Sequence, residues 1–261
     1  MVERVVLWDF DGTLATRPGL WSSCVVEVLD ECQPGHGVTR AEVAGFLESK
    51  FPWHDWGTVH DAVRGPDAWW EPIIALIADA MVGVGVPPGS ARAAAAQFRE
   101  CFLNPARWHV YPDSVDALRL SAMGGWRNVV LSNHVPELPE LIRHLGLDEH
   151  VHAVVTSAAH GHEKPHPGAF RIALETAGAP EVAWMVGDNP IADIAGAAQV
   201  GIPGVLTRSP DFDPHYLQRL ESSYGAARFP DWQQHCGLRA GTALEAVKII
   251  LGEKRSSSST G

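Results

Sequence analysis

The sequence predicts an α/β protein with a parallel-sheet core and an inserted helical lobe. A short apolar strand, Val5–Trp8, opens the chain, and helices and strands alternate from about residue 111 onward. The segment between these two parts shows only helical periodicity. Strands that alternate with helices of this length form βαβ units in a parallel, Rossmann-like sheet. The first strand is therefore expected to join the later block, with the helical segment outside it.

Four helical segments are predicted in the lobe. Apolar residues recur at the helical period over 20–32, and Thr39 opens a capping box with Glu42 before the second helix. A third helix is expected to carry residues 70–81, and Ser90 is expected to cap a fourth over 91–102.

The core elements follow in regular alternation. Helices are expected at 114–123, 136–145, 167–177 and 191–200, and strands at 127–132, 153–156, 182–187 and 204–206. Beyond residue 207 the pattern weakens to a short helix at 216–220 and irregular structure at 229–241, and Thr242 is expected to cap a last helix ending at Leu251. This assigns 1–15 and 105–255 to the core, 16–104 to the lobe, and 256–261 to a disordered tail.

Composition and charge exclude several functional classes. A formal net charge of −11 argues against a nucleic-acid or anionic-membrane surface. The longest apolar stretch, 73–86, contains Asp79 and is too short to span a bilayer. The four cysteines are scattered without CxxC spacing, and residues 1–4 lead into a strand rather than a secretory leader, so a reduced cytoplasmic protein is expected. No pattern indicates the oligomeric state.

Polar side chains follow three of the predicted strands. Asp9 and Asp11 follow the first, Ser132 and Asn133 come after Leu131 at the end of the strand at 127–132, and Asp188 follows the strand at 182–187. Taken singly, such residues indicate ordinary turns or helix caps. Adjacent parallel strands lie about 4.8 Å apart, however, and ligands of open α/β sheets bind at their carboxyl ends. The convergence predicts a site at this edge.

The carboxylates at this edge predict a metal ion. Asp9, Asp11, Asp188 and Asp193 are expected to crowd one crevice. Each close pair of carboxylates would repel by roughly 4 kcal/mol at an effective dielectric of about 20. Oxygen ligands without a nearby cysteine favour a hard divalent ion, Mg²⁺ above all.

Four segments together resemble the motifs of the haloacid dehalogenase-like hydrolase superfamily, in the expected order. They are DFDGTL at Asp9–Leu14, LSN at Leu131–Asn133, KPHPGAF at Lys164–Phe170 and GDNPIAD at Gly187–Asp193. The helical insertion resembles the first type of cap domain of that superfamily. The resemblance covers residues 1–15 and 110–206. The segment from Ser209 departs from the common short ending and receives no role from it.

This resemblance implies a Mg²⁺-dependent phosphatase acting on a small phosphorylated metabolite. Asp9 would be the nucleophile that forms an aspartyl-phosphate. Asp11 would be the general acid for the leaving oxygen and then the base for water. The carboxylates of Asp9 and Asp188 and the backbone carbonyl of Asp11 would hold the metal ion.

The resemblance also implies a set of phosphate-binding residues. Thr13 would orient the nucleophile loop and is grouped with Ser132, Asn133 and Lys164, which would surround the phosphoryl group. Asp193 would lie behind the metal ligands or hold Lys164.

Four alternatives remain open on the same residues. A haloacid dehalogenase would use the same nucleophile on carbon, but the resembling enzymes lack an acid at the position of Asp11. A phosphonate hydrolase resembles enzymes with a cap lysine, and this lobe offers only Lys50. A phosphomutase would share the core, and a non-catalytic binding module is possible because fold does not fix function.

Two further clusters have simpler interpretations. His160, His162 and His166 suggest zinc, but the prolines among them break any helical spacing, so a plain loop is favoured. Most tryptophans of the lobe are expected to form its core. A less favoured interpretation places Trp53–Trp56 at the mouth of the crevice as a specificity surface.

Overall fold

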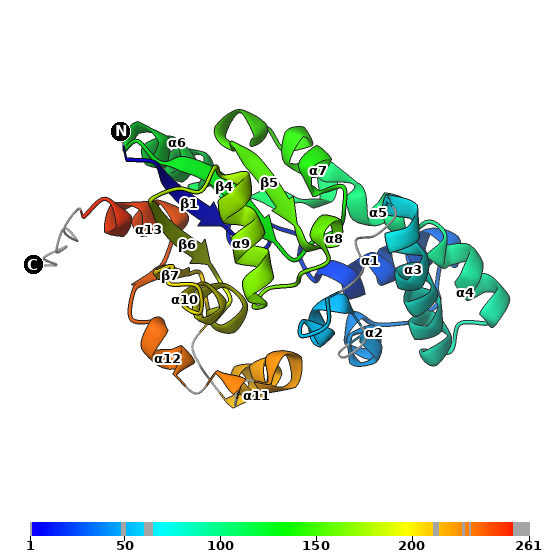
Figure 1. Ribbon diagram of the computed structural model, residues 1–261. Helices are drawn as coiled ribbons and strands as arrows, with labels where there is room; N and C mark the ends of the chain where they lie inside the picture. The colour runs from blue at the N-terminus through cyan, green and yellow to red at the C-terminus, as the bar shows by residue number, and fades with distance from the viewer. Residues whose placement is uncertain are drawn as a thin grey trace, which may run out of the picture.

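A six-stranded parallel sheet forms the centre of the molecule in the computed structural model, which describes residues 2–47, 51–59, 65–210, 214–225, 228–229 and 231–252 (Figure 1). The strand order is β5-β4-β1-β6-β7-β8, and every pair is parallel. The bounds are β1 Arg4–Trp8, β4 Arg127–Ser132, β5 Ala153–Thr156, β6 Val182–Gly187, β7 Gly204–Thr207 and β8 Arg239–Ala240. The predicted α/β class is confirmed, with the first strand between β4 and β6.

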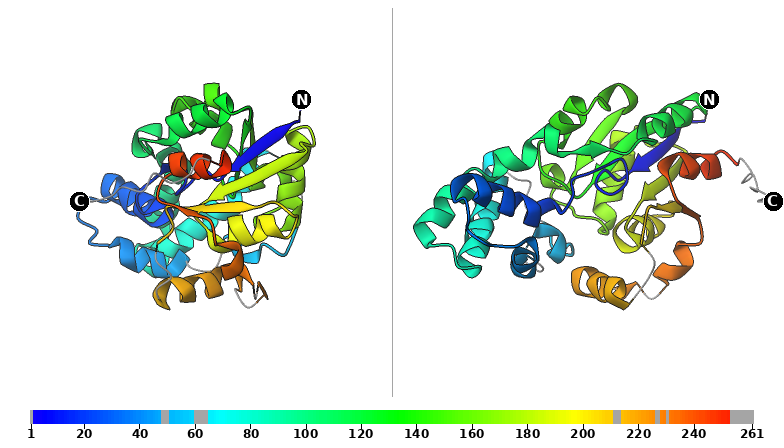
Figure 2. Two further views of the ribbon diagram at one scale, coloured as in Figure 1. Left: turned by 90° about the vertical axis from the view of Figure 1, so that its left-hand side faces the viewer. Right: turned by 180° about the vertical axis from the view of Figure 1, so that it is seen from behind.

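Helices cover both faces of the sheet, which explains the unbroken apolar run in β1 (Figure 2). Side chains alternate between the two faces of a strand. Val6 and Trp8 pack in one cluster with α6 (Ser114–Met123) and α13 (Ala243–Ile250). Val5 and Leu7 pack in another with α9 (Pro167–Thr176) and α10 (Gly196–Ala198). All four side chains are fully buried, as expected for a sheet with both faces covered.

The helical lobe lies beyond the carboxyl ends of the strands (Figure 1). Its elements are α1 Leu20–Cys32, α2 Arg40–Leu47, η1 Pro52–Asp55, α3 Pro66–Gly83, α4 Pro88–Ala95 and α5 Phe98–Leu103. The chain enters it through β2 (Ala15–Thr16) and leaves through η2 (Pro105–Arg107) and β3 (His109–Val110). These two crossings pair as an antiparallel ribbon. The bounds 16–104 remain our prediction for the lobe.

Local signals fix several helix starts. The capping box at α2 is confirmed, because the Thr39 backbone N–H donates to Glu42 Oε2 (2.8 Å). The cap at α13 is also confirmed, because Thr242 Oγ1 accepts from the Glu245 backbone N–H (3.1 Å). The predicted cap at Ser90 is wrong. Helix α4 already begins at Pro88, since proline is well suited to a first helical turn, and the segment breaks into α4 and α5.

Three predictions after β6 need correction. The expected helix at 191–200 begins instead as a wide π-type turn, η4 (Pro190–Ala195), that continues into α10. The irregular structure expected at 229–241 contains α12 (Trp232–His235) and the edge strand β8, whose two residues are too few to show a period. The short helix expected at 216–220 is the longer α11 (Pro214–Tyr224).

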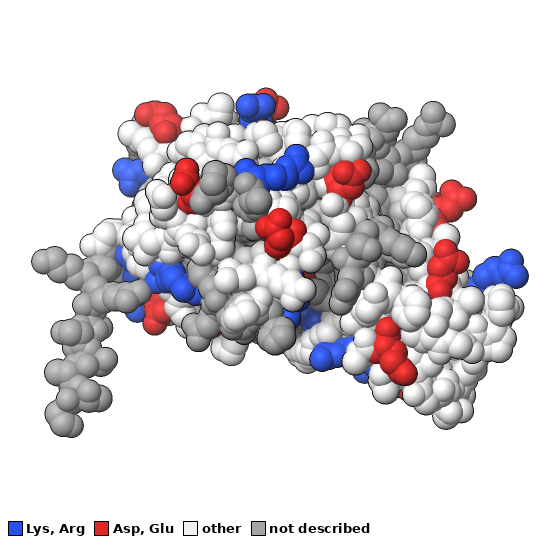
Figure 3. All heavy atoms as spheres, turned by 90° about the horizontal axis from the view of Figure 1, so that it is seen from below, with Lys and Arg blue, Asp and Glu red and all other residues white. Residues whose placement is uncertain are grey.

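Of the remaining elements, α7 (Leu138–His144) agrees with the helix predicted at 136–145, whereas the short helices η3 (Asp148–His150) and α8 (Ser157–His160) were not predicted. The tail predicted at 256–261 and Lys50 lie outside the described residues. None of the helices in the described ranges is long and apolar enough to cross a membrane. On the face drawn in Figure 3, the coloured basic and acidic side chains of the described residues are interspersed rather than gathered by sign.

Candidate active site

A cavity of about 310 Å³ opens at the carboxyl ends of the strands, where the helical lobe meets the core. Its size is typical of small-molecule sites, about 300–1,000 Å³. It is lined by Asp9, Asp11, Leu20, Trp21, Trp53, Phe102, Ser132, Asn133, His134, Lys164, Asp188, Asn189, Ala192, Asp193 and Tyr224. The predicted edge of the sheet is therefore the floor of a cavity, and the lobe supplies its opposite wall.

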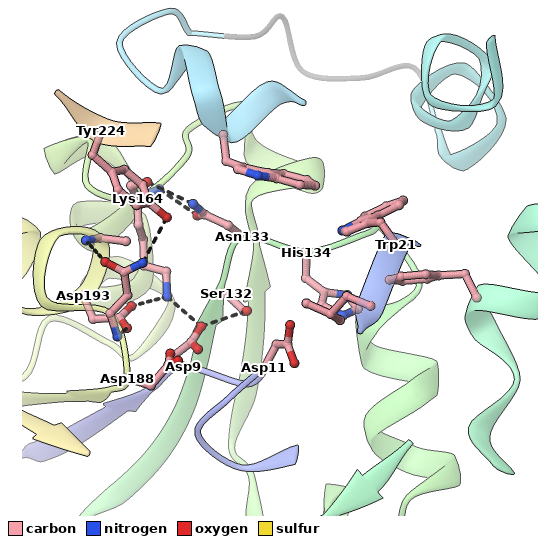
Figure 4. A pocket seen from close by; sticks show the side chains of 15 residues that line it. Asp9, Asp11, Trp21, Ser132, Asn133, His134, Lys164, Asp188, Asp193 and Tyr224 are labelled. Atoms are coloured by element: carbon pink, nitrogen blue, oxygen red, sulfur yellow. Dashed lines mark hydrogen bonds and ion pairs between the residues drawn. The ribbon is translucent and has the colours of Figure 1, made fainter. Parts of the chain in front are cut away.

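Asp9 lies at the centre of the floor (Figure 4). Its backbone N–H donates to the carbonyl of Val186 (2.9 Å), which extends the pairing of β1 with β6 past the last strand residue. Its Oδ1 accepts from Ser132 Oγ (2.9 Å) and from Lys164 Nζ (2.7 Å). Two segments far apart in sequence thus hold the carboxylate, and a third holds the backbone of Asp9.

Lys164 is buried and bridges two carboxylates. Its Nζ lies 2.5 Å from Asp193 Oδ1 as well as 2.7 Å from Asp9 Oδ1. Burial alone would lower the pKa of Lys164, but Asp193 and Asp9 raise it, so the side chain stays charged. Asn133 fixes its backbone, since the Lys164 N–H donates to Asn133 Oδ1 (2.7 Å) and Asn133 Nδ2 donates to the Lys164 carbonyl (2.9 Å).

Those bonds show that Asn133 positions Lys164. Direct contact between the Asn133 amide and a phosphate remains a prediction.

The wide turn of η4 returns Asp193 to the cavity. Asn189 Oδ1 accepts from the backbone N–H groups of Ile191 (3.0 Å) and Ala192 (2.9 Å), and Asp193 Oδ2 accepts from the Asn189 N–H (3.0 Å). Such single π-type turns are common at functional sites. Both oxygens of Asp193 therefore already have partners, which agrees with the prediction that it holds Lys164.

Asp9, Asp188 and Asp193 each place one carboxylate oxygen within 4.8 Å of the others. The donors are all oxygen, which suits Mg²⁺, so the chemistry of the set fits the predicted metal. The predicted third ligand, the Asp11 carbonyl, is a backbone group outside this carboxylate set. Among the described residues, the cluster of His160, His162 and His166 forms no such three-ligand group.

The acidic side chains of the cavity repel one another electrostatically. Desolvation and, to a smaller extent, the neighbouring Asp9 carboxylate together raise the pKa of Asp11 to about 8. Desolvation and the charge of Asp9 also raise the pKa of Asp188 well above its usual range. Desolvation raises the pKa of Asp193 to about 6 although Lys164 lowers it. A cation bound among these groups would relieve this repulsion.

Gly12 shows why a glycine follows the second aspartate. Its φ is +87°, and an added Cβ would lie 2.5 Å from Asp188 Oδ2. Only glycine adopts this conformation readily and leaves the space free. The turn after β1 and the acidic loop after β6 can therefore approach closely.

Thr13 is fully buried but does not line the cavity. Its carbonyl accepts from Arg208 Nε (3.0 Å), and Arg208 is ion-paired with Asp113. The structure thus places Thr13 behind the loop that follows β1. This position favours the predicted orienting role over direct contact with a phosphate.

The C-terminal segment supplies a cavity residue that sequence reasoning missed. Tyr224 at the end of α11 lines the cavity, and its hydroxyl accepts from Asn189 Nδ2 (3.1 Å). Its carbonyl accepts from Trp56 Nε1 (3.3 Å) of the lobe. No motif marks Tyr224, because a lone tyrosine on a short helix carries no spacing signal.

Comparisons with known proteins agree with this geometry. A family model described as haloacid dehalogenase-like hydrolase matches residues 3–201. The chain is 38% identical over 122 residues to haloacid dehalogenase-like hydrolase domain-containing protein 3 of Homo sapiens, covering 46% of this chain and 49% of that protein. It is 38% identical over 123 residues to phosphoserine phosphatase of Thermus thermophilus, covering 46% of this chain and 48% of that protein. The chain spans about half the length of the curated relatives it matches.

A solved structure shares the fold over nearly the whole chain. A crystal structure of a HAD phosphatase from Thermococcus onnurineus superposes with a TM-score of 0.60 at 21% identity, covering 97% of this chain and 99% of that chain. Because the family model matches from the start of β1 through every loop that carries the buried carboxylates, we conclude that this chain is a hydrolase and belongs to the haloacid dehalogenase-like hydrolase family.

Proposed function

We propose that the protein is a Mg²⁺-dependent phosphatase that hydrolyses a small phosphorylated metabolite through an aspartyl-phosphate. The observation that carries this proposal is the fixed Asp9 carboxylate, held by Ser132 and Lys164, with Asp11 beside it in the same cavity. A carboxylate held in one orientation is ready for in-line attack. The ammonium and hydroxyl groups that hold it are also donors for phosphoryl oxygens.

Two steps follow from this placement. The Asp9 carboxylate attacks phosphorus, the bond from phosphorus to the ester oxygen breaks, and Asp11 gives its proton to the departing oxygen. Asp11 then takes a proton from water, which attacks the phosphorus of the aspartyl-phosphate and releases phosphate and the free Asp9 carboxylate. Both roles require Asp11 to face the cavity, and Asp11 is one of the residues that line the cavity.

The carboxylates of Asp9 and Asp188 and the Asp11 carbonyl would hold Mg²⁺, which when bound would neutralise charge on the phosphoryl oxygens. Lys164 would place its charge on the other side of Asp9, where Asp193 holds it. Ser132 would donate to the phosphoryl group once Asp9 has reacted. The arrangement would surround the transferring group with positive charge.

The side chain of Asp11 favours a phosphatase over a dehalogenase. A dehalogenase displaces a halide, which needs no proton, so an acid in this position would have no use. The relative of Thermus thermophilus is named a phosphatase, which supports the same choice.

An isotope experiment tests the reaction type. Phosphorylated metabolites are screened with Mg²⁺, and the best substrate is then turned over in ¹⁸O-water. We expect the label in inorganic phosphate and none in Asp9, because water attacks phosphorus. Label in the Asp9 carboxylate would indicate that Asp9 forms an ester with a carbon of the substrate and that water attacks the carbonyl of that ester. No phosphate release from any ester would contradict the proposal.

We also propose that the helical lobe, residues 16–104, moves as a lid over the cavity. Two crossings, β2 and β3, join it to the core, so it can swing as a body. Closure would exclude water during phosphoryl transfer. A crosslink that holds the lobe open should depress turnover of the physiological ester, and unchanged turnover with a verified crosslink would leave the lobe a fixed wall.

A further inference from the structure

The cavity has an aromatic half opposite the carboxylates. We use this name for Trp21, Trp53, Phe102 and His134, which line the cavity on the side of the lobe. The Trp21 and Phe102 rings stack with centroids 4.4 Å apart, and Trp21 and Trp53 lie 5.5 Å apart. In Figure 4, Asp11 lies between Asp9 and the side chains of Trp21 and His134. A leaving group that receives its proton from Asp11 would therefore extend into the aromatic half.

His134 is the polar group of this half, and its ring is unpartnered. The residue is 6% exposed, and neither ring nitrogen has a hydrogen-bond partner among the described residues. The ring packs against Phe10 (5.5 Å), Trp108 (5.4 Å) and Phe102 (6.0 Å). A buried polar group without a partner costs about 1–3 kcal/mol. A bound ligand that pairs with it would remove that cost.

The protonation of His134 defines what it can bind. Burial lowers the pKa of His134 to about 3, although the neighbouring Val135 backbone raises it, so the ring is neutral and carries one N–H donor and one acceptor nitrogen. The surrounding rings offer flat apolar surface. Together they suit a planar ligand that carries a hydroxyl or amide group.

The charges of the cavity argue against an anionic leaving group. Of the described residues that line it, Lys164 is the one lysine or arginine, and Asp9 and Asp193 already engage it. A carboxylate or second phosphate on the substrate would meet the acidic side chains without a counter-charge of its own. The leaving group should therefore be uncharged.

We propose that the substrate is a phosphate monoester of an uncharged aromatic alcohol that carries a hydrogen-bonding group, and that His134 selects it by pairing with that group. This inference rests on the proposed phosphatase activity and adds the class of substrate. The stacked rings of the lobe would hold the aromatic ring of the alcohol, while the phosphoryl group lies at Asp9. His134 is then a specificity residue that contacts substrate away from phosphorus.

Five esters of primary alcohols test the inference with leaving oxygens of similar basicity. They are 3-hydroxybenzyl, 3-carbamoylbenzyl and benzyl phosphate, O-phosphoserine and phosphocholine. We expect kcat/KM for benzyl phosphate to exceed that for the last two by at least about tenfold, since burial of an aromatic ring is worth that much. The better of the two substituted benzyl esters should exceed benzyl phosphate by at least about fivefold, the effect of one hydrogen bond.

Variants of His134 separate hydrogen bonding from packing. In His134→Phe the preference for the better substituted ester over benzyl phosphate should fall to about one, with the change mainly in KM because the bond forms on binding. His134→Gln should retain part of the preference. His144→Phe, a substitution of an exposed histidine in α7, is the matched control and should leave the preference intact.

The outcomes distinguish this inference from the proposed function. A wild-type preference for O-phosphoserine or phosphocholine overturns the inference but leaves the phosphatase standing, and phosphocholine would identify the rings as an ammonium cage. An unchanged preference in His134→Phe overturns the role of His134. No turnover of these five esters, with phosphate released from another metabolite of the screen, would contradict this inference alone, whereas no phosphate release from any ester with Mg²⁺ would contradict the proposed function and this inference with it.

Discussion

The two halves of the cavity are built in opposite ways. The polar half, Asp9, Asp11, Ser132, Lys164, Asp188 and Asp193, stands on strand ends and the loops after them, and hydrogen bonds fix several of its members to one another. Three rings of the aromatic half, Trp21, Trp53 and Phe102, stand on helices of the lobe and pack together, while His134 comes from the core loop after β4. Rigid strands suit a reaction that tolerates little displacement. The lobe can change its surface without disturbing that chemistry, so reaction and selection can be altered separately.

The largest effect should come from Asp9. Replacing Asp9 with Asn removes the proposed nucleophile but keeps the size of the side chain, and we expect turnover to fall by on the order of 10⁴-fold or more. Steady-state kinetics measure the loss, and circular dichroism checks the fold. Near wild-type turnover, with deamidation excluded by mass spectrometry, would mean that the reaction does not need Asp9. It would contradict the assignment of the reaction to the polar half.

Metal removal should be nearly as severe. Excess EDTA should abolish phosphate release, and added Mg²⁺ should restore it. A readout independent of activity is thermal stability, because Mg²⁺ at 100 times its Kd should stabilise the fold by about 2.7 kcal/mol. In Asp188→Asn this stabilisation should be strongly reduced. Full activity in excess EDTA would contradict the metal assignment.

Asp11→Asn should have an intermediate effect. General acid–base catalysis contributes roughly 10²–10⁴-fold, and the nucleophile is intact in this variant. Rapid-quench measurements should therefore show slow formation of the aspartyl-phosphate and still slower hydrolysis. Loss of the intermediate altogether would make Asp11 essential for attack rather than for proton transfer.

Glu163 gives a smaller effect, on stability rather than reaction. Burial raises its pKa to about 7, although Ser157 and Lys164 lower it. The folded state holds the proton of Glu163 more tightly than the unfolded state does. This proton binding therefore stabilises the fold fully below about pH 4.5, and the stabilisation is lost as pH rises through about 7. In Glu163→Gln the pH-dependent loss in the free energy of unfolding, about 3 kcal/mol, should be absent.

Thermal unfolding of both proteins between pH 4.5 and 8 measures this difference. The acidic residues of the cavity act in both proteins, so the difference isolates Glu163. A constant difference in Tm across this range would contradict the buried, protonated carboxyl.

The smallest effects should separate two tryptophans of the lobe. Trp53 lines the cavity, whereas Trp56 packs against Phe229 (5.5 Å) and lies under the Arg228 guanidinium (4.3 Å). Trp53→Leu should alter the ranking of the benzyl esters by several-fold, of the order of 1 kcal/mol. Trp56→Leu should change kcat/KM for all esters by the same factor. If Trp56→Leu altered the ranking and Trp53→Leu did not, the surface that selects the substrate would lie beside the C-terminal segment instead.

The polar half could be predicted from the sequence because charged residues directly follow apolar strands. Asp9 follows a strand that is buried on both faces, and Asp188 follows another, so parallel pairing alone brings them together. Ser132 ends β4, the strand on the other side of β1. Lys164, by contrast, is separated from β5 by α8, and the resemblance to the family was needed to assign it.

The aromatic half could not be predicted in the same way. Helical periodicity marks Trp21 as apolar but does not tell whether its ring faces the core of the lobe or a cavity. The less favoured interpretation of Trp53–Trp56 as a specificity surface is supported by the position of Trp53, but Trp56 does not line the cavity. Tyr224 and strand β8 were missed because two-residue strands and isolated rings have no period.

The most direct test of the account is to trap the intermediate on Asp9. Wild-type enzyme is acid-quenched during turnover of benzyl phosphate with Mg²⁺, reduced with borohydride and digested for mass spectrometry, because borohydride converts an acyl phosphate to the alcohol. The account predicts homoserine in place of Asp9 in the wild type and unreduced peptide when substrate is omitted. Reduction at Asp11 or Asp188 instead, or unreduced Asp9 during verified turnover, would contradict it.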